Sequence, residues 1–492
     1  MDFNKKINAL RPHNPQKSVQ GSLESDRGRI INSAALRRLQ QKTQVFPLER
    51  NAAVRSRLTH SLEVQQNGRY IAQTIVKELK KQKLAPELYD DLATSLESLV
   101  EMACLMHDIG NPAFGHFGEA AINDWFKRYL SQHPAYALDM AQLSSHKYNE
   151  NVPLKTRLLF DLCNFEGNAQ AIRIIHTLSS LNLTYCQTAS ILKYTRCATQ
   201  PKPPLDSSTS YLQKKVGYYY SEQQFVNELC NALHIKVGHR HPAAYIMEAA
   251  DDIAYCLADI EDAVEKGFIS VDTLRVLLAE EYQSILSTLP PSEQIYKQFV
   301  TDKCTYAYER ACENLANFDN EFFIWLRVGL IHTLVKHAAT RFIGNLEAVY
   351  HGSFNSALLE DQSYQYAITQ TLKNVALKHV FCHKEVEELE LQGYKITSGI
   401  LDEYRRLLEL DAHQFMQIIN KDRGFPIETR LLNRMSPKFV AIYKQTINQL
   451  TPEQTQHPIF EFYYRSRLLQ DFLSGMTDQF AYDTYRTLVV AD

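Results

Sequence analysis

The segment from His107 to Glu119 concentrates chemically able side chains more densely than any other stretch of this 492-residue chain. It reads HDIGNPAFGHFGE, in which a His-Asp pair is followed by three glycines, a second His and a Glu. An imidazole nitrogen beside a carboxylate oxygen can bind one divalent metal ion. The His and Glu beyond the glycines can transfer protons near that ion. The segment therefore predicts a metal-dependent hydrolase.

Apolar side chains spaced three and four residues apart predict the helices that position this segment. One stripe runs from Leu92 to Met106 and ends at His107, where Gly110 and Pro112 stop the helix. A second helix is expected to begin near Glu119. Its inward residues would be Ile122, Trp125, Phe126 and Tyr129.

Further helices are expected over 55–76, through Ile246–Ile260 as far as Gly267, and over 322–348 and 397–420. In the first of these, Leu58, Leu62 and Tyr70 would face inward. Alternating strand patterns are rare, and 197–210 is a Pro/Ser-rich loop. We expect an all-α fold with a core over 20–270 and a helical extension over 271–492, unless the two form one continuous domain.

His60 and Asp251 could complete a metal site with His107 and Asp108, in the order H…HD…D. Mixed nitrogen and oxygen ligands fit Mn²⁺, Mg²⁺, Fe²⁺ or Ni²⁺, whereas the lack of thiolates disfavours structural zinc. Each residue alone has an ordinary alternative. A His-Asp dipeptide arises by chance, His60 could be a hydrogen-bonded core residue, and Asp251 could be an ion-pair partner on a helix.

Composition limits the remaining function classes. The net charge of −3 gives no global basic field for a nucleic acid. Nine scattered cysteines without CxxC pairs favour a reducing compartment. We expect a cytoplasmic protein without a membrane partner, because neither a signal peptide nor an apolar span appears.

Longer strings carry a family resemblance. The H…HD…D order is that of the HD phosphohydrolase superfamily, and the chain resembles its bacterial deoxyguanosinetriphosphate triphosphohydrolases. Ala113, where the family favours proline, and the segments 130–155 and 197–210 depart from that pattern. The strings that carry the resemblance lie at 24–66, 107–126 (HDIGNPAFGHFGEAAINDWF), 165–178 (FEGNAQAIRIIHTL), 247–266, 378–404 and 466–486 (SRLLQDFLSGMTDQFAYDTYR).

The resemblance implies hydrolysis of dGTP to deoxyguanosine and inorganic triphosphate with Mg²⁺ or Mn²⁺. It also implies a homo-oligomer, a hexamer in the relatives, with single-stranded DNA as an effector. The implied metal ligands are His60, His107, Asp108 and Asp251, and the implied catalytic pair is His116 and Glu119. His116 would transfer a proton or attack phosphorus, while Glu119 would orient it. Glu119 could also simply favour a helix N-terminus.

The implied substrate contacts follow the same family pattern. Tyr255 would exclude a 2′-hydroxyl, Asp259 and Gln44 would bind the 3′-hydroxyl, and Glu390 would accept hydrogen bonds from guanine. Ordinary alternatives are core packing for Tyr255 and a solvated helix face for Glu390. The full implied set is Gln44, Lys193, Tyr194, Lys215, Tyr255, Asp259, Phe381, Glu390, Arg423 and Arg430.

Two other classes of function remain open. Another HD-superfamily enzyme would share the H…HD…D order: a broader dNTPase, a 5′-nucleotidase or a guanosine tetraphosphate hydrolase. The last would need an acidic pair soon after Asp108, where Ile109 to Pro112 stand. A single-stranded nucleic-acid-binding or nuclease protein could use Lys214, Lys215 and the tyrosines 218–220 for charge and stacking.

Overall fold

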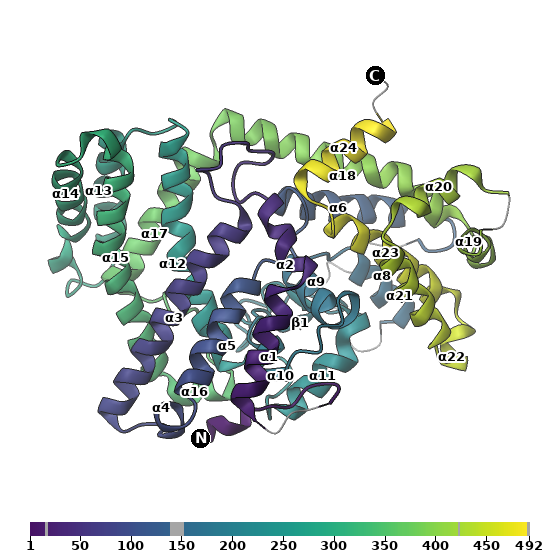
Figure 1. Cartoon of the computed structure of the whole chain (residues 1–492), viewed down its shortest axis with the longest axis horizontal. Helices are drawn as coiled ribbons and strands as arrows, with labels where there is room; N and C mark the ends of the chain where they lie inside the picture. Colours follow the sequence, from purple (N-terminus) through teal and green to yellow (C-terminus); the bar gives the residue numbers. More distant parts are fainter. Residues whose placement is uncertain (15–17, 138–151, 422–423, 490–492) are drawn as a thin grey trace.

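Helices make up almost all of the regular structure in the computed structural model, which describes residues 1–14, 18–137, 152–421 and 424–489 (Figure 1). Among these residues the strands are β1 (Arg196–Cys197) and β2 (Val216–Tyr218), which pair in parallel. The expected all-α fold with a large helical extension is therefore confirmed. No helix in the described ranges has the length and apolar character needed to cross a membrane.

The middle of the molecule is built from α3 (Arg57–Gln82), α5 (Ala93–Met106) and α12 (Pro242–Glu265), with α1 (Val19–Ile31) beside them (Figure 1). Ser56 begins α3 with a capping box, and Pro242 occupies the first turn of α12. At Gly68, a Cβ would lie 2.5 Å from the sulfur of Cys104, so α3 and α5 touch backbone to side chain. This close packing brings the helix of His60 against the helix that ends at His107.

Two helical blocks flank this middle part (Figure 1). The block at the left of Figure 1 comprises α13 (Val271–Leu286), α14 (Phe299–Cys312), α15 (Phe318–Gly344) and α17 (Tyr364–Ala376). The block at the right comprises α19 (Ala412–Ile419), α20 (Pro426–Arg434), α21 (Pro437–Asn448), α22 (Pro452–Thr455) and α23 (Pro458–Ser474). The long helix α18 (Lys384–Glu409) runs along the molecule between the blocks (Figure 1).

The shorter helices fill the space around the middle part and close the ends of the chain. They are α2 (Ala34–Arg38), α4 (Glu87–Asp90), α6 (Gly115–Ser131), α8 (Leu154–Leu162), α9 (Gly167–Arg173), α10 (Tyr185–Ala189), α11 (Gln223–Ala232), α16 (Leu346–His351) and α24 (Asp478–Val489). A π-helical turn, η7 (Leu377–Phe381), follows α17 and leads to α18.

Buried ion pairs tie α23 to α8 and α9. Arg467, fully buried, donates to the backbone carbonyl of Asp161 at 3.1 Å and also pairs with its carboxylate. Arg173 on α9 donates to Asp471 at 2.6 and 2.7 Å and to Glu222 at 2.9 Å. Removing one member of such a pair leaves an uncompensated buried charge, so these contacts fix the extension against α8 and α9.

Several expected boundaries were wrong. The helix expected over 397–420 breaks between α18 and α19, because Asp411 forms a capping box that starts a new helix. The run 322–348 likewise divides into α15 and α16, and α6 begins at Gly115 rather than near Glu119. Leu62 was expected to face inward but is 51% exposed, so the buried stripe of α3 follows His60, Val64 and Ile71 instead. The division of the chain at residue 270 stays a prediction.

Candidate active site

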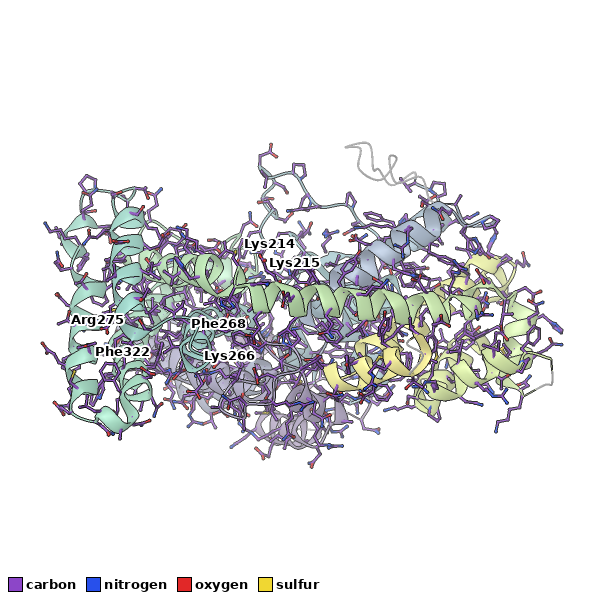
Figure 2. The ribbon with its side chains drawn as sticks, turned by 90° about the horizontal axis from the view of Figure 1, so that it is seen from above. Lys214, Lys215, Lys266, Phe268, Arg275 and Phe322 are labelled. Carbon is purple, nitrogen blue, oxygen red and sulfur yellow. The ribbon has the colours of Figure 1, made fainter. Side chains whose placement is uncertain are left out.

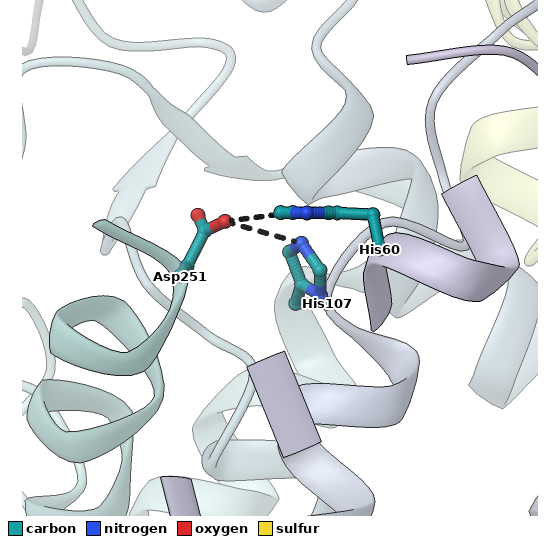
Figure 3. Close-up of side chains that lie close together, drawn as sticks. All are labelled: His60, His107 and Asp251. Carbon is teal, nitrogen blue, oxygen red and sulfur yellow. Dashed lines mark hydrogen bonds and ion pairs between the residues drawn. The ribbon is translucent and has the colours of Figure 1, made fainter. Parts of the chain in front are cut away.

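Three ligand-type side chains from three different helical elements meet in the middle part (Figure 3). His60 lies in α3, His107 follows the end of α5, and Asp251 lies in α12. The Nε2 atoms of His60 and His107 lie 3.3 and 3.4 Å from Oδ1 of Asp251, and all three ligand atoms lie within 4.8 Å of one another. This arrangement could hold one metal ion.

A second set of contacts leaves the ring of His107 ready to bind a cation. Its Nδ1 donates to the carbonyl of Cys104 at 2.7 Å, which leaves Nε2 facing Asp251. Burial lowers the pKa of His107, but the carboxylates of Asp108 and Asp251 outweigh it and raise the pKa to about 9. The imidazole of His107 therefore holds a proton strongly beside these two carboxylates. A divalent cation would compete with that proton for the same negative charge.

Asp108 lies beside this trio and is held by its neighbours. Its Oδ1 is 3.5 Å from Nε2 of His107 and accepts a hydrogen bond from Asn111 at 2.7 Å. Its Oδ2 accepts from Arg57 at 2.6 Å. Burial raises the pKa of Asp108, yet His107 and Arg57 lower it to about 2. The carboxylate therefore stays ionised, and Arg57 is a partner that the sequence reading missed.

His116 and Glu119 form a hydrogen-bonded pair on the first turn of α6. The Nδ1 of His116 lies 2.9 Å from Oε2 of Glu119, and Oε1 of Glu119 accepts the N–H of Gly167 at 2.7 Å. The hydrogen bond to Glu119 raises the pKa of His116, although burial opposes it. Glu119 is buried while the imidazole is open to the cavity, so Nε2 of His116 is the atom free to act.

The loop between His107 and His116 is shaped by close packing. A Cβ at Gly110 would lie 1.9 Å from the carbonyl oxygen of Gly167 and 2.4 Å from the nitrogen of Ala171. Only glycine leaves room there for the first turn of α9. Phe114 adopts the left-handed conformation with φ of 62°, which turns the chain into α6.

A cavity of about 650 Å³ opens onto both clusters. Its cationic lining residues are Arg57, Lys193, Lys215 and Lys373, and its acidic ones are Asp108, Glu166, Asp251, Asp252 and Glu390. Lys215, labelled in Figure 2 near the middle of the molecule, pairs with Glu166 at 3.3 Å. The volume suits a nucleotide-sized ligand, and a bound divalent cation would shift the balance of charge toward binding an anion.

Most of the expected substrate-binding residues line this cavity. They are Gln44, Lys193, Tyr194, Lys215, Tyr255, Phe381 and Glu390. The rings of Tyr255 and Phe381 stack with centroids 6.2 Å apart. Lys193 donates to Oδ2 of Asp251 at 3.4 Å, so it links the metal cluster to the cavity wall. Burial raises the pKa of Glu390, and the nearby negative charge of Glu387 raises it further.

Two of the other expected residues do not line the cavity. Asp259 is fully buried and does not line the cavity, and burial raises its pKa well above the usual range. Arg430 is exposed on α20, does not line the cavity, and donates to the carbonyl of Pro426 at 2.7 Å. Arg423 lies outside the described residues. Within its own chain, therefore, Arg430 is not part of the cavity wall.

Glu166 and Asn168 were missed as individual site residues, although the segment 165–178 had been singled out. Both line the cavity, and the amide of Asn168 donates to Oε1 of Glu166 at 2.8 Å. They flank Gly167 in the sequence, but only the packing of α9, which brings the Gly167 N–H to Glu119, shows that they reach the cavity.

Comparison with known proteins points to one family. Residues 57–152 match the family model described as "HD domain". The chain is 50% identical to the probable deoxyguanosinetriphosphate triphosphohydrolase of Pseudomonas aeruginosa, covering 99% of each chain. It is 48% identical to the deoxyguanosinetriphosphate triphosphohydrolases of Yersinia pseudotuberculosis and Serratia proteamaculans, covering 100% of this chain and 99% of theirs.

Proposed function

Because this chain belongs to the deoxyguanosinetriphosphate triphosphohydrolase family, we propose that it hydrolyses dGTP to deoxyguanosine and inorganic triphosphate. The observation that carries the proposal is the single cavity in which the His60, His107 and Asp251 cluster lies beside the His116–Glu119 pair. The α-phosphate of a nucleotide would lie between these two clusters.

The cofactor in this proposal is Mg²⁺ or Mn²⁺, held by His60, His107, Asp108 and Asp251. Two imidazoles and two carboxylates are a donor set that suits such ions. When bound, the ion would neutralise phosphate charge and lower the pKa of water. The ionised state of Asp108 and the Nε2 atom of His107, which faces Asp251 because Nδ1 binds the carbonyl of Cys104, support this assignment.

His116 acts in this proposal as a general acid. A water molecule adds to the α-phosphorus and gives up a proton to solvent, while the bond from that phosphorus to the 5′-oxygen breaks. The 5′-oxygen of deoxyguanosine receives a proton from Nε2 of His116, which takes up a proton from solvent before the next turnover. The raised pKa of His116 favours the protonated imidazole that this role needs. Glu119 holds Nδ1 and so orients the ring. Lys193, Tyr194 and Lys215 bind the triphosphate, whose negative charge the two lysines offset.

Base and sugar selection are assigned to three other residues that line the cavity. Glu390 accepts hydrogen bonds from guanine N1–H and the 2-amino group, whereas adenine presents an acceptor at N1. Tyr255, stacked on Phe381, fills the space of a 2′-hydroxyl. Gln44 contacts the 3′-hydroxyl.

Product analysis tests the reaction directly. The purified protein is incubated with dGTP and Mg²⁺ or Mn²⁺, and products are separated by ion-exchange chromatography. Deoxyguanosine and intact triphosphate in equal amounts are expected. Orthophosphate or pyrophosphate as the first product would refute cleavage at the α-phosphorus, and loss of bound Mn²⁺ in a His116→Ala variant would refute its place outside the metal ligands.

The family resemblance also supports a homo-oligomer, a single-stranded DNA effector and a cytoplasmic location, which we propose as further properties. Arg430, which does not line the cavity of its own chain, would then contact a nucleotide in the cavity of a second copy. Light scattering with and without a single-stranded oligonucleotide tests the assembly, and dGTP turnover in the same samples tests the effector.

A further inference from the structure

The C-terminal part of the chain reaches the loop of the candidate site through one buried carboxylate. Asp478, the first residue of α24, is 3% exposed. Its Oδ1 accepts the N–H of Phe114 at 3.1 Å, and its Oδ2 accepts the N–H and the hydroxyl of Thr43 at 3.0 and 2.7 Å. Asp478 therefore joins the residue that precedes α6 to a segment that lines the cavity.

The conformation of Phe114 makes this contact consequential. A bulky residue with positive φ costs free energy and persists only where its surroundings enforce it. Phe114 caps α6, and His116 stands two residues further along. The direction in which the imidazole enters the cavity thus depends on a strained residue whose N–H is bound by Asp478.

A buried lysine makes a similar connection at Asn111, three residues before Phe114 in the loop. Lys42 is 2% exposed, and its Nζ donates to the carbonyl of Asn111 at 2.5 Å and to the carbonyl of Ser474 at 2.8 Å. The side chain of Asn111 in turn donates to Asp108. The loop backbone is therefore fixed at Asn111 and Phe114 by residues from both ends of the sequence.

Asp471 supports the other side of the catalytic pair. It binds the guanidinium of Arg173, and it accepts from Gln170 at 3.0 Å, both on α9. The first N–H of α9, that of Gly167, donates to Glu119. Asp471, Ser474 and Asp478, which we call the clasp, therefore fix the supports of both His116 and Glu119.

We propose that Asp478 is a positioning residue for the hydrolysis, which sets the entry of His116 into the cavity by holding Phe114 and Thr43 together. This inference rests on the proposed dGTP hydrolysis. The clasp lies within the segment 466–486, one of the segments that resemble the family, and its contacts give that segment a structural role. Through the clasp, the helical extension directly contacts the loop and the helix that hold His116 and Glu119.

The test compares Asp478→Asn with Asp483→Asn, a matched change at an exposed position of the same helix. Asn keeps the shape of Asp478 but cannot accept hydrogen bonds with both branches. A misplacement of catalytic groups by about 1 Å costs on the order of a hundredfold in rate. We expect kcat for dGTP to fall by about tenfold to a hundredfold with KM changed by less than about threefold, while Asp483→Asn behaves as the parent chain.

Hydrogen exchange measured by mass spectrometry gives a second readout that does not depend on activity. The peptide spanning 107–119 should exchange faster in Asp478→Asn than in the parent chain, while peptides from α14 and α15 exchange as before. Unchanged kcat together with unchanged exchange in that peptide would overturn the inference. A parent chain that leaves dGTP intact would instead refute the proposed function, and the exchange result would still decide the role of Asp478 in holding the loop.

Discussion

Replacing Glu119 with glutamine separates the two jobs that this side chain performs. The Oε1 atom of glutamine can still accept the N–H of Gly167, which now binds Glu119 at 2.7 Å. The amide nitrogen, however, would donate to Nδ1 of His116, where a carboxylate oxygen now lies at 2.9 Å. The proton on Nδ1 would then be lost, and the imidazole would be held neutral.

The size of the effect follows from the bond that is lost. A hydrogen bond to a charged group contributes about 1.5–3 kcal/mol, which corresponds to a roughly tenfold to 150-fold change in rate. We therefore expect kcat for dGTP to fall by that factor. The hydrogen bond from Glu119 raises the pKa of His116, so the protonated acid is present below that raised pKa and is lost as pH rises through it. In Glu119→Gln the alkaline loss of activity should begin at a lower pH.

The assay is a pH series of kcat at saturating metal and dGTP, with products separated by chromatography. Asp124→Asn is the matched control, because Asp124 pairs with Lys127 three residues away on the exposed face of the same helix. The control should keep the parent profile. A Glu119→Gln variant with the parent kcat and the same alkaline limb would refute the assignment of His116 as the acid.

Three other substitutions test separate features. Gly110→Ala should lower the free energy of unfolding by about 3 kcal/mol, because its Cβ would lie 1.9 Å from a backbone oxygen; an unchanged urea midpoint would contradict this packing. Arg467→Met should lower the free energy of unfolding, measured in urea, by about 3–5 kcal/mol, because it removes the ion-pair partner of the buried carboxylate of Asp161. Arg405→Met, at the exposed pair with Glu409, should lower it by less than about 1 kcal/mol. Glu390→Gln should lower kcat/KM for dGTP by about tenfold relative to kcat/KM for dATP, while the exposed control Glu388→Gln should leave this ratio unchanged. Equal losses for both nucleotides, or the same change of the ratio in the control, would show that Glu390 does not bind the base.

The local sequence directly predicted the parts of the site encoded within one helix or one loop, whereas His60 and Asp251 were joined to them only through the H…HD…D order. His107 and Asp108 end an apolar stripe, and the spacing of three residues between His116 and Glu119 places them on one helix turn. The three- and four-residue spacing of apolar side chains predicted the all-α fold. The segments that resemble the family predicted candidate site residues over most of the chain.

The parts that the sequence did not predict depend on which elements come together. Nothing near Arg57 indicates that it binds Asp108, and nothing near Asp478 indicates Phe114, more than 350 residues away. Helix breaks such as the one at Asp411 were also missed, because a local capping box interrupts an apolar period that continues across it. Leu62 faces solvent because the buried stripe of α3 is set by its contacts with α5 and α12.

The helix α12 carries Asp251 at the metal cluster and Tyr255 at the cavity wall, one turn apart on a single unbroken rod. Each residue of an α-helix advances about 1.5 Å and turns about 100°. An insertion or deletion of one residue between these two positions would thus swing the tyrosine out of the cavity while leaving the aspartate in place. We therefore expect that related chains which differ in sugar choice differ by a substitution at the position of Tyr255. The number of residues between Asp251 and Tyr255 should be the same in all of them.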